Sequence, residues 1–231
     1  MLEFREVSFA YRRRKNRVKA VSGLTFSVGE GELCAVTGPS GCGKSTLLRL
    51  AGGLLRPDSG SVLLDGQTPD PRRVSIGLLS QGYGLLAWKT VLDNILLPFT
   101  LRHEKPSPQA LSEILGTLGL SDLLDRYPAE LSGGQRQRVA LARVFVRKPD
   151  LLLLDAPFAA LDLLTAEKSR ALFRQIWERY RITALLVTHN PAEAASLAEK
   201  ILLLRGTNPG VIHGLFGDLS ESELRNHLSG I

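Results

Sequence analysis

A glycine-rich segment from Gly38 to Thr46 carries the residues with the plainest chemical use. It fits the pattern G-x-x-x-x-G-K-[S/T]. Its glycines let backbone N–H groups converge on phosphate oxygens, because no Cβ stands in the way. Lys44 adds a full positive charge for the β- and γ-phosphates, and the Ser45 hydroxyl is a ligand for Mg²⁺. The segment therefore predicts a site for a nucleoside triphosphate with Mg²⁺.

The alternative for this segment is an ordinary glycine-rich turn. Its placement argues against that interpretation, because it follows a short apolar run at 33–36 and precedes a run typical of a helix at 47–51. A chance match in a chain of this length is on the order of one in a hundred. The predicted phosphate-binding residues are Gly38, Pro39, Ser40, Gly41, Cys42, Gly43, Lys44, Ser45 and Thr46.

A carboxylate closes the apolar run 151–154, which consists of four leucines typical of a buried strand. Asp155 follows this run directly. An aspartate in such a place is usually a helix cap or a turn residue. Downstream of a phosphate loop, however, a carboxylate at the end of a buried strand can hold Mg²⁺ directly or through water. We therefore expect Asp155 to be a magnesium ligand.

The segment 131–135 (Leu-Ser-Gly-Gly-Gln) precedes a helical run. Ser132 and Gln135 have the spacing of a capping box, so a well-capped helix would explain them alone. The two glycines between them, Gly133 and Gly134, exceed what capping needs and leave backbone N–H groups open to an anion. This segment is therefore a second candidate for phosphate contact.

Together the phosphate loop, Asp155 and the segment 131–135 resemble the ATP-binding cassette family. The resemblance covers nearly the whole chain, from about Leu2 to Leu204. It implies an ATPase whose subunits work as pairs facing head to tail. ATP on Lys44 of one subunit would then be closed over by the other subunit's Ser132, Gly133, Gly134 and Gln135.

The resemblance also assigns four residues that would otherwise pass as structural. Tyr11 lies where the family places the aromatic ring that stacks on adenine. Gln81 matches the glutamine that approaches Mg²⁺ and links to the partner subunit. His189 matches the histidine that contacts the γ-phosphate. Asp162 belongs to the loop that communicates across the dimer interface.

One position departs from the family pattern. The carboxylate matching Asp155 is usually followed by a glutamate that polarises the attacking water, and here that position is Ala156. A methyl group can neither accept a proton nor orient water. General-base positioning typically contributes ~10²–10⁴-fold, or about 3–5 kcal/mol of barrier. Because the phosphate loop and Asp155 are intact, we expect the chain to bind Mg-ATP and to hydrolyse it slowly.

Three explanations of Ala156 remain open from the sequence. It is an engineered substitution that traps ATP, or a natural degenerate site paired with a competent one in a heterodimer, or a site where another group positions the water. The choice between a homodimer and a heterodimer is open for the same reason.

The elements that would position these residues form an α/β pattern. Short strands separated by turns occupy the first third, with a slip in alternation at Glu6 and Val7 that suits a bulge. A helical stretch follows from Thr90 to about Gln137, with prolines such as Pro98 marking its boundaries. Strand–helix units then imply a parallel sheet covered on both faces.

Together with this pattern, the resemblance implies one ATP-binding cassette domain over residues 1–231, with a P-loop NTPase (RecA-like) core around a parallel sheet. An N-terminal antiparallel β subdomain and an inserted α-helical subdomain complete it. The predicted parts are a catalytic core with the β subdomain at 1–81 and 139–205, a helical subdomain at 82–138 and a C-terminal tail at 206–231.

The composition of the chain indicates the class of protein and the compartment in which it works. The chain has 231 residues, of which 44% are apolar and 23% charged, as in ordinary globular proteins. Its two cysteines suit a reduced compartment. The sequence has no secretory signal and no run long enough to span a bilayer. The formal charge of +6 is concentrated between Arg12 and Lys19. We interpret this cluster as a solvated loop, with no nucleic acid partner expected, because no aromatic residues are interleaved for stacking.

The segment 81–94 resembles the corresponding region of the ATPases of nitrate, sulfonate and taurine importers, although Gly82 and Ala87 replace the usual Glu and Pro. This implies transmembrane permease subunits, a second nucleotide-binding subunit, a substrate-binding protein, and a location at the cytoplasmic face of the membrane. Either packing within the helical subdomain or docking of a permease would account for the apolar residues Tyr83, Leu85, Leu86 and Trp88.

Two other functions remain. A soluble cassette ATPase acting on DNA or the ribosome is disfavoured, because neither a long coiled coil nor a second cassette is present. A nucleotide-dependent scaffold that never hydrolyses ATP is suggested only by Ala156. A small-molecule kinase would share the phosphate loop but would not need the segment 131–135. The transported solute is not encoded in these motifs.

Overall fold

A computed structural model of the chain describes residues 1–13, 16–204, 212–216 and 220–229. Their strands are β1 (Leu2–Arg13), β2 (Asn16–Val28), β3 (Leu33–Thr37), β4 (Ser59–Leu64), β5 (Ile76–Leu79), β6 (Leu151–Asp155), β7 (Thr183–Val187), β8 (Lys200–Leu204) and β9 (Ile212–Phe216). Their α-helices are α1 (Lys44–Ala51), α2 (Val91–Thr100), α3 (Pro108–Leu118), α4 (Gly133–Phe145), α5 (Leu163–Tyr180), α6 (Pro191–Leu197) and α7 (Glu221–Ser229).

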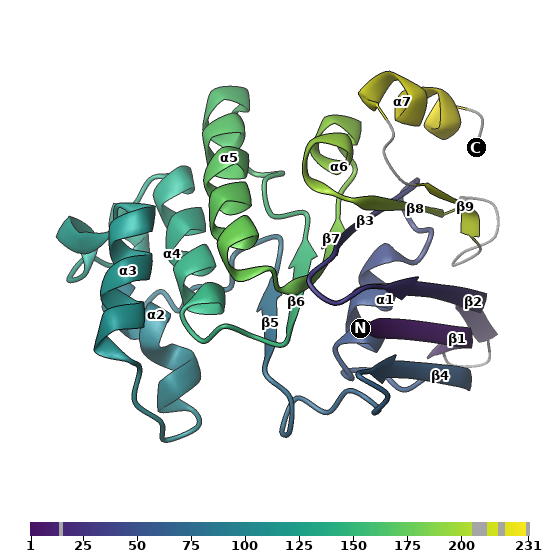
Figure 1. Cartoon of the computed structure of the whole chain (residues 1–231), viewed down its shortest axis with the longest axis horizontal. Coiled ribbons are helices and arrows are strands. Elements are labelled where there is room, and N and C mark those ends of the chain that lie inside the picture. The colour runs from purple at the N-terminus through teal and green to yellow at the C-terminus, as the bar shows by residue number, and fades with distance from the viewer. Residues whose placement is uncertain (14–15, 205–211, 217–219, 230–231) are drawn as a thin grey trace.

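The larger sheet has the strand order β5-β6-β7-β3-β8-β9. Its first five strands run parallel, as the alternation of strands and helices predicted, and β9 pairs antiparallel with β8. In Figure 1, α5 and α6 cover one face of this sheet and α1 lies on the other. The order places the carboxyl ends of β3, β6 and β7 at one edge, where the phosphate loop, Asp155 and His189 follow their strands.

The buried strands divide their side chains between two apolar cores. Along β6, Leu152 and Leu154 belong to the core shared with α4 and α5, and Leu151 and Leu153 belong to the core shared with α1. Successive residues of a strand point to opposite faces, so a strand covered on both faces must be apolar throughout. This is why the four leucines before Asp155 predict the strand correctly.

The smaller sheet is antiparallel and has the order β2-β1-β4. The slip predicted in β1 is a bulge: the pairing with β2 shifts between Phe4 and Val7, and Glu6 has φ of 52°. The left-handed conformation of this extra residue restores the inward direction of the next apolar side chain. Phe4 then stacks on Phe26 with ring centroids 4.6 Å apart. This sheet packs on α1 through the second core.

The helical part lies at the opposite end of the molecule from the smaller sheet (Figure 1). The helices α2, α3 and α4 pack there around Ile95, Ile114 and Val139. Pro98 does not mark a boundary as predicted, because it lies within the last turn of α2. The predicted division between residues 138 and 139 falls inside α4, which runs on to Phe145.

The region predicted as a C-terminal tail is folded in part. Strand β9 extends the larger sheet, and α7 packs beside α6 (Figure 1). Leu224 of α7 is fully buried in a small core with Ala194 and Ile201. These described residues therefore complete an edge of the sheet.

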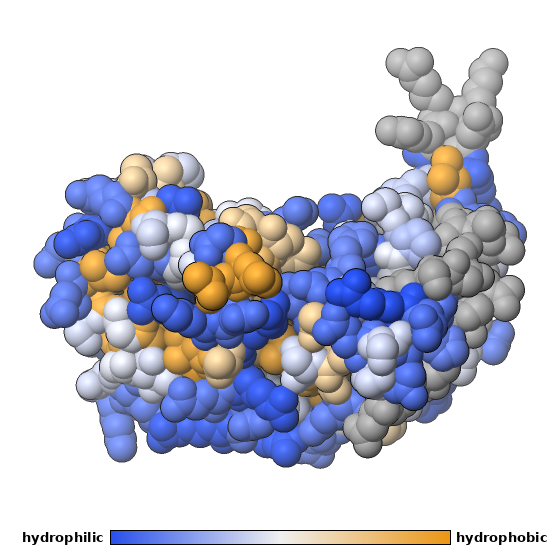
Figure 2. All heavy atoms as spheres, turned by 90° about the horizontal axis from the view of Figure 1, so that it is seen from above, coloured by the Kyte–Doolittle hydropathy of each residue, from blue (hydrophilic) through white to orange (hydrophobic). Residues whose placement is uncertain are grey.

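In the described ranges, no helix combines the length and apolarity needed to cross a bilayer. Apolar side chains do gather on the surface over the helical half of the molecule, whereas the opposite half is mainly polar (Figure 2). Large exposed apolar residues include Leu101 at the end of α2 and Leu163 and Leu164 at the start of α5, which are 69–73% exposed.

Candidate nucleotide-binding site

A hollow of about 350 Å³ opens between the smaller sheet and the start of α1. Residues of the predicted site from three separate parts of the chain meet there: Tyr11 from β1, most of the phosphate loop, and His189 after β7. The hollow is lined by Tyr11, Val18, Lys19, Ala20, Ser40, Gly41, Gly43, Lys44, Ser45, Thr46 and His189. Its size and its basic lining suit the phosphates of a nucleotide.

Lys44 is fixed in place by the loop that precedes it. Its Nζ donates to the carbonyl oxygens of Gly38 and Pro39, each at 2.7 Å, and lies 3.5 Å from Sγ of Cys42. The residue is only 5% exposed, and this burial lowers the pKa of the ammonium group against the opposing effects of Cys42 and Asp155. The two carbonyl contacts hold a cation at the place where phosphate oxygens are expected.

The glycines of the loop are required by close approaches and by backbone conformation. Gly38 has φ of 147°, and a Cβ there would lie 2.6 Å from the carbonyl oxygen of Leu204. Gly43 has φ of 104° and is the N-cap of α1. Residues with side chains are strained in this region of φ, so the loop can turn into α1 only with glycine at these positions.

Tyr11 closes the hollow from the side of β1. Its hydroxyl lies 3.2 Å from Oγ1 of Thr46, and its ring meets Phe9 edge-on with centroids 4.9 Å apart. Its cross-strand partner on β2 is Val18, which is 49% exposed beside the hollow. A flat apolar surface formed by a tyrosine and a valine suits a nucleobase.

Sequence reasoning missed the contribution of β2. Val18 was not singled out, and Lys19 was assigned to a solvated basic loop, although it lines the hollow. The pairing of Tyr11 with Val18 in a hairpin would have been the signal, because neighbouring residues of two paired strands share one surface. Arg17 of the same basic cluster instead pairs with Asp58 at 2.9 Å. Arg14 and Lys15 lie outside the described residues.

Asp155 and His189 follow neighbouring strands, β6 and β7. Asp155 is half-buried and close enough to Lys44 to act on the pKa of that lysine. The pKa of His189 is lowered, first by partial burial and then by the charge of Lys44, whereas Asp155 and a backbone hydrogen bond at Gly38 act in the opposite direction. A neutral imidazole is therefore favoured beside the phosphate loop.

The donor set fits Mg²⁺. Ser45 lines the hollow. The Asp155 carboxylate, at the end of β6, is close enough to Lys44 to raise the pKa of that lysine. Ser45 and Asp155 both offer hard oxygen ligands, which Mg²⁺ prefers and completes with water and phosphate oxygens. Gln81, the third predicted ligand, is exposed two residues beyond the end of β5 and does not line the hollow.

The residues predicted to act on a partner's nucleotide lie elsewhere in the chain. Ser132 and Gln135 form the predicted capping box, with Gln135 N–H donating to Ser132 Oγ at 3.2 Å and Ser132 N–H donating to Gln135 Oε1 at 2.8 Å. Asp162 caps α5 by accepting from Thr165 N–H at 3.0 Å. Hydrogen bonds from the side chain and then from the backbone of Thr165 lower the pKa of the Asp162 carboxyl group. None of these residues lines the hollow, and α4 and α1 stand on opposite sides of β6 (Figure 1).

The two glycines of this segment also serve packing within the chain. A Cβ on Gly134 would lie 2.7 Å from Cγ2 of Thr165, and one on Gly133 would lie 3.4 Å from Leu161. Nearby, the buried Gln137 donates to the carbonyl oxygen of Pro157 at 3.0 Å. The start of α4 is therefore packed tightly on the loop that follows Asp155.

Ala156 occupies an unusual backbone conformation. Its φ is 46°, in the left-handed region, and its N–H donates to the carbonyl oxygen of Val187 at 2.9 Å. The side chain is 8% exposed. The hydrogen bond holds the backbone at the ends of β6 and β7 whatever side chain stands at this position. The missing function at position 156 is therefore a matter of its side chain, because a methyl group cannot accept a proton.

A buried polar cluster behind His189 was not predicted. Thr188 donates to Glu193 Oε2 at 2.5 Å and accepts from Asn190 N–H at 3.0 Å. Arg170 of α5 lies 3.7 Å from the other carboxylate oxygen of Glu193. Burial raises the pKa of Glu193, although both partners favour its charged form. These contacts tie the segment that carries His189 to α5, and only the three-dimensional fold reveals them.

Comparison with known proteins identifies the family to which the chain belongs. A family model described as ABC transporter matches residues 21–159. The aliphatic sulfonates import ATP-binding protein SsuB of Cupriavidus necator is 46% identical over 186 residues, covering 78% of this chain and 59% of that protein. The taurine import ATP-binding protein TauB of Pelagibacter ubique is 39% identical over 216 residues, covering 88% and 81%.

Among solved structures, a dimeric post-hydrolysis state of the ATP-binding cassette MJ0796 bound to ADP and Pi has a TM-score of 0.82 and 31% identity, and covers 95% of this chain and 100% of that one. The chain spans 59% of the length of SsuB and 64% of the sulfate/thiosulfate import ATP-binding protein CysA of Pectobacterium atrosepticum. The predicted resemblance to the sulfonate and taurine group is confirmed. With more than half of its 231 residues matched by the family model, the chain belongs to the ABC transporter family.

Proposed function

We propose that this chain is the ATP-binding and ATP-hydrolysing subunit of an importer of small anions or organic solutes. The observation that carries the proposal is the arrangement of Lys44, whose ammonium group is held by two loop carbonyls beneath Tyr11 and beside His189. The 46% identity with a sulfonate import ATP-binding protein supports the solute class. Bound Mg²⁺, held by Ser45 and Asp155 with Gln81 approaching, would neutralise charge on the terminal phosphates.

In this proposal, the residues that bind and orient ATP are all present, whereas the residue that would activate the attacking water is absent. Lys44 and His189 face the expected phosphates, whereas Ala156 offers no proton acceptor beside them. We therefore expect measurable ATP binding in the presence of Mg²⁺ together with slow release of phosphate. Fast ATP hydrolysis by the purified chain would contradict the proposal that the general base is missing at position 156.

Closure by a second nucleotide-binding subunit completes the proposed site. Ser132–Gln135 and Asp162 do not line the hollow of their own chain, which supports a role against the nucleotide of a partner. The relative MJ0796 was solved as a dimer. Size-exclusion chromatography should show a larger species in Mg-ATP than without nucleotide. A monomer at saturating Mg-ATP would contradict homodimer closure, and addition of a competent second subunit then tests a heterodimer.

Coupling to transmembrane permease subunits is the second part of the proposal. Tyr83 is 6% exposed and Leu85 packs against the main core, so these two residues serve packing. Trp88, in contrast, is 74% exposed. A hollow of about 360 Å³ is lined by Leu78 of β5, Leu97 of α2 and Leu101, together with Arg102, Arg143 and Arg147. These apolar residues support docking of a short permease helix on this face.

The docking surface is tested by co-purification of the chain with polytopic membrane proteins. We expect Trp88→Ser to weaken recovery of a permease, while ATP binding stays unchanged. A substrate-binding protein would join such a complex through the permease, at the far side of the membrane from this chain, which would sit at the cytoplasmic face. Recovery of DNA or ribosomal proteins in place of a membrane protein would contradict the importer.

A nucleotide-dependent scaffold is the second candidate, and Ala156 is the observation that favours it. A scaffold would close around ATP and stay closed, because no carboxylate at position 156 activates water. The two candidates differ in phosphate release by the assembled complex: an importer must turn over when the permease and solute are present, and a scaffold must not.

A further inference from the structure

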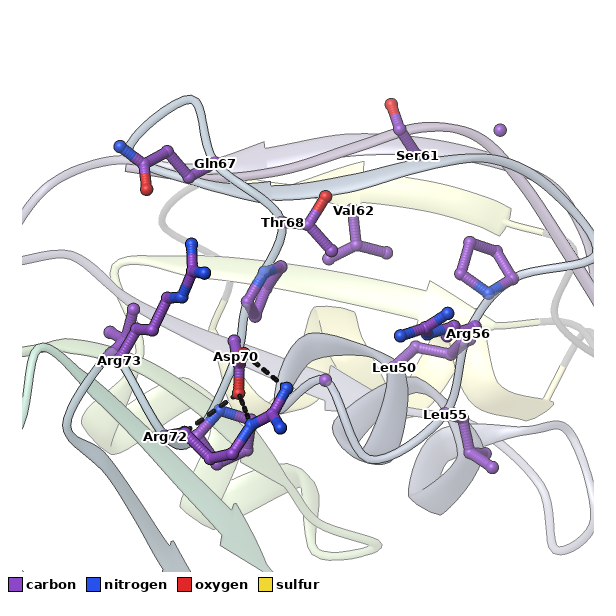
Figure 3. Close-up of a pocket in the computed structure, with 16 residues that line it drawn as sticks. Leu50, Leu55, Arg56, Ser61, Val62, Gln67, Thr68, Asp70, Arg72 and Arg73 are labelled. Carbon is purple, nitrogen blue, oxygen red and sulfur yellow. Dashed lines mark hydrogen bonds and ion pairs between the residues drawn. The ribbon is translucent and has the colours of Figure 1, made fainter.

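A second hollow, of about 1030 Å³, lies beside the last turn of α1, at the end of this helix that is away from the phosphate loop. Figure 3 shows the side chains that line it. Its walls come from the end of α1, from β4 and from the connection between β4 and β5. We propose that this hollow is a binding site for an organic oxyanion, a molecule with a sulfonate, carboxylate or phosphate group on a short aliphatic body. This inference does not depend on the proposed function.

The charge of the hollow is unbalanced. Three arginines line it, Arg56, Arg72 and Arg73, against the single carboxylate of Asp70. Asp70 is already committed to Arg72: Nε donates to Oδ1 at 3.1 Å and Nη2 donates to Oδ2 at 3.0 Å. These bonds, with smaller contributions from the charges of Arg72 and Arg73, lower the pKa of Asp70 to about 2, so the Asp70–Arg72 pair is formed at all ordinary pH values.

The other carboxylates of this segment are also occupied. Asp58 pairs with Arg17 and accepts from Ala10 N–H at 2.8 Å, and Asp65 pairs with the N-terminal ammonium group. Among the described residues, the guanidinium groups of Arg56 and Arg73 have no hydrogen-bonded partner and form no ion pair. Figure 3 shows these two side chains on opposite sides of the hollow, with the Asp70–Arg72 pair lower in the view.

The walls of the hollow are held by close backbone contacts. A Cβ on Gly53 would lie 2.1 Å from the carbonyl oxygen of Pro69, and one on Gly60 would lie 2.3 Å from that of Arg5. Arg102 donates to the carbonyl oxygen of Pro71 at 2.6 Å. Such contacts fix the loop before a ligand arrives, which lowers the entropy cost of binding.

The lining also restricts the class of anion. The half-buried Leu55 and Val74 and three prolines offer aliphatic surface. None of the lining residues, all of which belong to the described part of the chain, is aromatic, so a nucleobase would find no ring to stack on. The volume is that of a site for an organic molecule, and a bare tetrahedral oxyanion would fill only a small part of it.

The test is calorimetric titration of the full chain with 1-hexanesulfonate at low ionic strength. We expect a dissociation constant on the order of 1 mM or tighter, from a small ligand with one charged group. Arg56→Gln and Arg73→Gln should each weaken binding by about fivefold or more, because each removes a charge-assisted hydrogen bond. Arg126→Gln, a change at an exposed arginine of the helical part, is the matched control and should leave the affinity unchanged.

Two further titrations locate the site and identify its ligand class. Saturating ATP should leave the affinity for hexanesulfonate unchanged, because the phosphate loop is a separate anion site. Val74→Thr should weaken hexanesulfonate binding and leave the weaker binding of inorganic sulfate as it is. Competition with ATP, equal affinities for sulfate and hexanesulfonate, or unchanged binding in the Arg56→Gln/Arg73→Gln double variant would each overturn the proposal.

Discussion

The phosphate loop and the loop that follows β6 stand at the ends of strands in one sheet, yet they differ in completeness. The first holds its lysine by two carbonyl contacts of 2.7 Å and meets a tyrosine and a histidine from elsewhere in the chain. The second has its aspartate in place but a methyl group at position 156. We therefore expect affinity for ATP and the rate of its hydrolysis to be separate properties of this fold, each depending on a different strand end.

The largest effect is expected when a carboxylate is introduced at position 156. Ala156→Glu should raise phosphate release by ~10²–10⁴-fold, the usual contribution of a positioned general base. Ala156→Gln is the matched control, since it has the same shape without a basic oxygen, and it should remain slow. If the two variants turn over equally slowly, the hydrolytic defect lies beyond position 156.

A second variant tests the phosphate loop, which we expect to provide the affinity for ATP. Lys44→Gln should weaken ATP affinity by about 10–100-fold, because a charge-assisted contact with phosphate is lost. Titration with a fluorescent ATP analogue measures the change. Lys105→Gln removes the charge of an exposed lysine away from the site and should leave affinity within the error of the wild-type value. Equal effects of the two variants would mean that Lys44 does not meet the nucleotide.

A smaller effect is expected from the polar cluster behind His189. Thr188→Val removes a hydrogen bond to Glu193 and another from Asn190 N–H, so the free energy of unfolding should fall by about 1–3 kcal/mol. Chemical denaturation measures it. Thr100→Val, on an exposed helix surface, is the control and should cost less than half as much. An equal loss in both would argue against a stabilising role for the cluster.

The smallest effect concerns the backbone at position 156. A left-handed conformation strains alanine by roughly 1–2 kcal/mol, and glycine relieves this strain but adds unfolded-state entropy worth about 0.5–1 kcal/mol. Ala156→Gly should therefore be neutral or slightly stabilising. Ala140→Gly, inside α4, has no strain to relieve and should lower the free energy of unfolding by about 1 kcal/mol. Similar losses in both variants would show that position 156 is not strained.

The contrast between the two loops also bears on what a sequence can predict. The phosphate loop, the β6 strand and the bulge at Glu6 depend on neighbours in the sequence, and all were predicted. Three other features depend on contacts between distant parts of the chain: Lys19 lines the hollow, Tyr83 is buried, and β9 and α7 complete one edge of the larger sheet. Local spacing does not encode such contacts, because residues far apart in the chain decide them.

Helix α1 is only eight residues long, and each of its ends borders a hollow. Lys44 stands at its first residue and Leu50 near its last, about 9 Å apart along the axis at the usual rise per residue. The helix therefore separates the two hollows by most of its length, and no residue lines both of them. We accordingly expect each hollow to bind its ligand without changing the affinity of the other, because an allosteric effect requires a coupling free energy between the two sites.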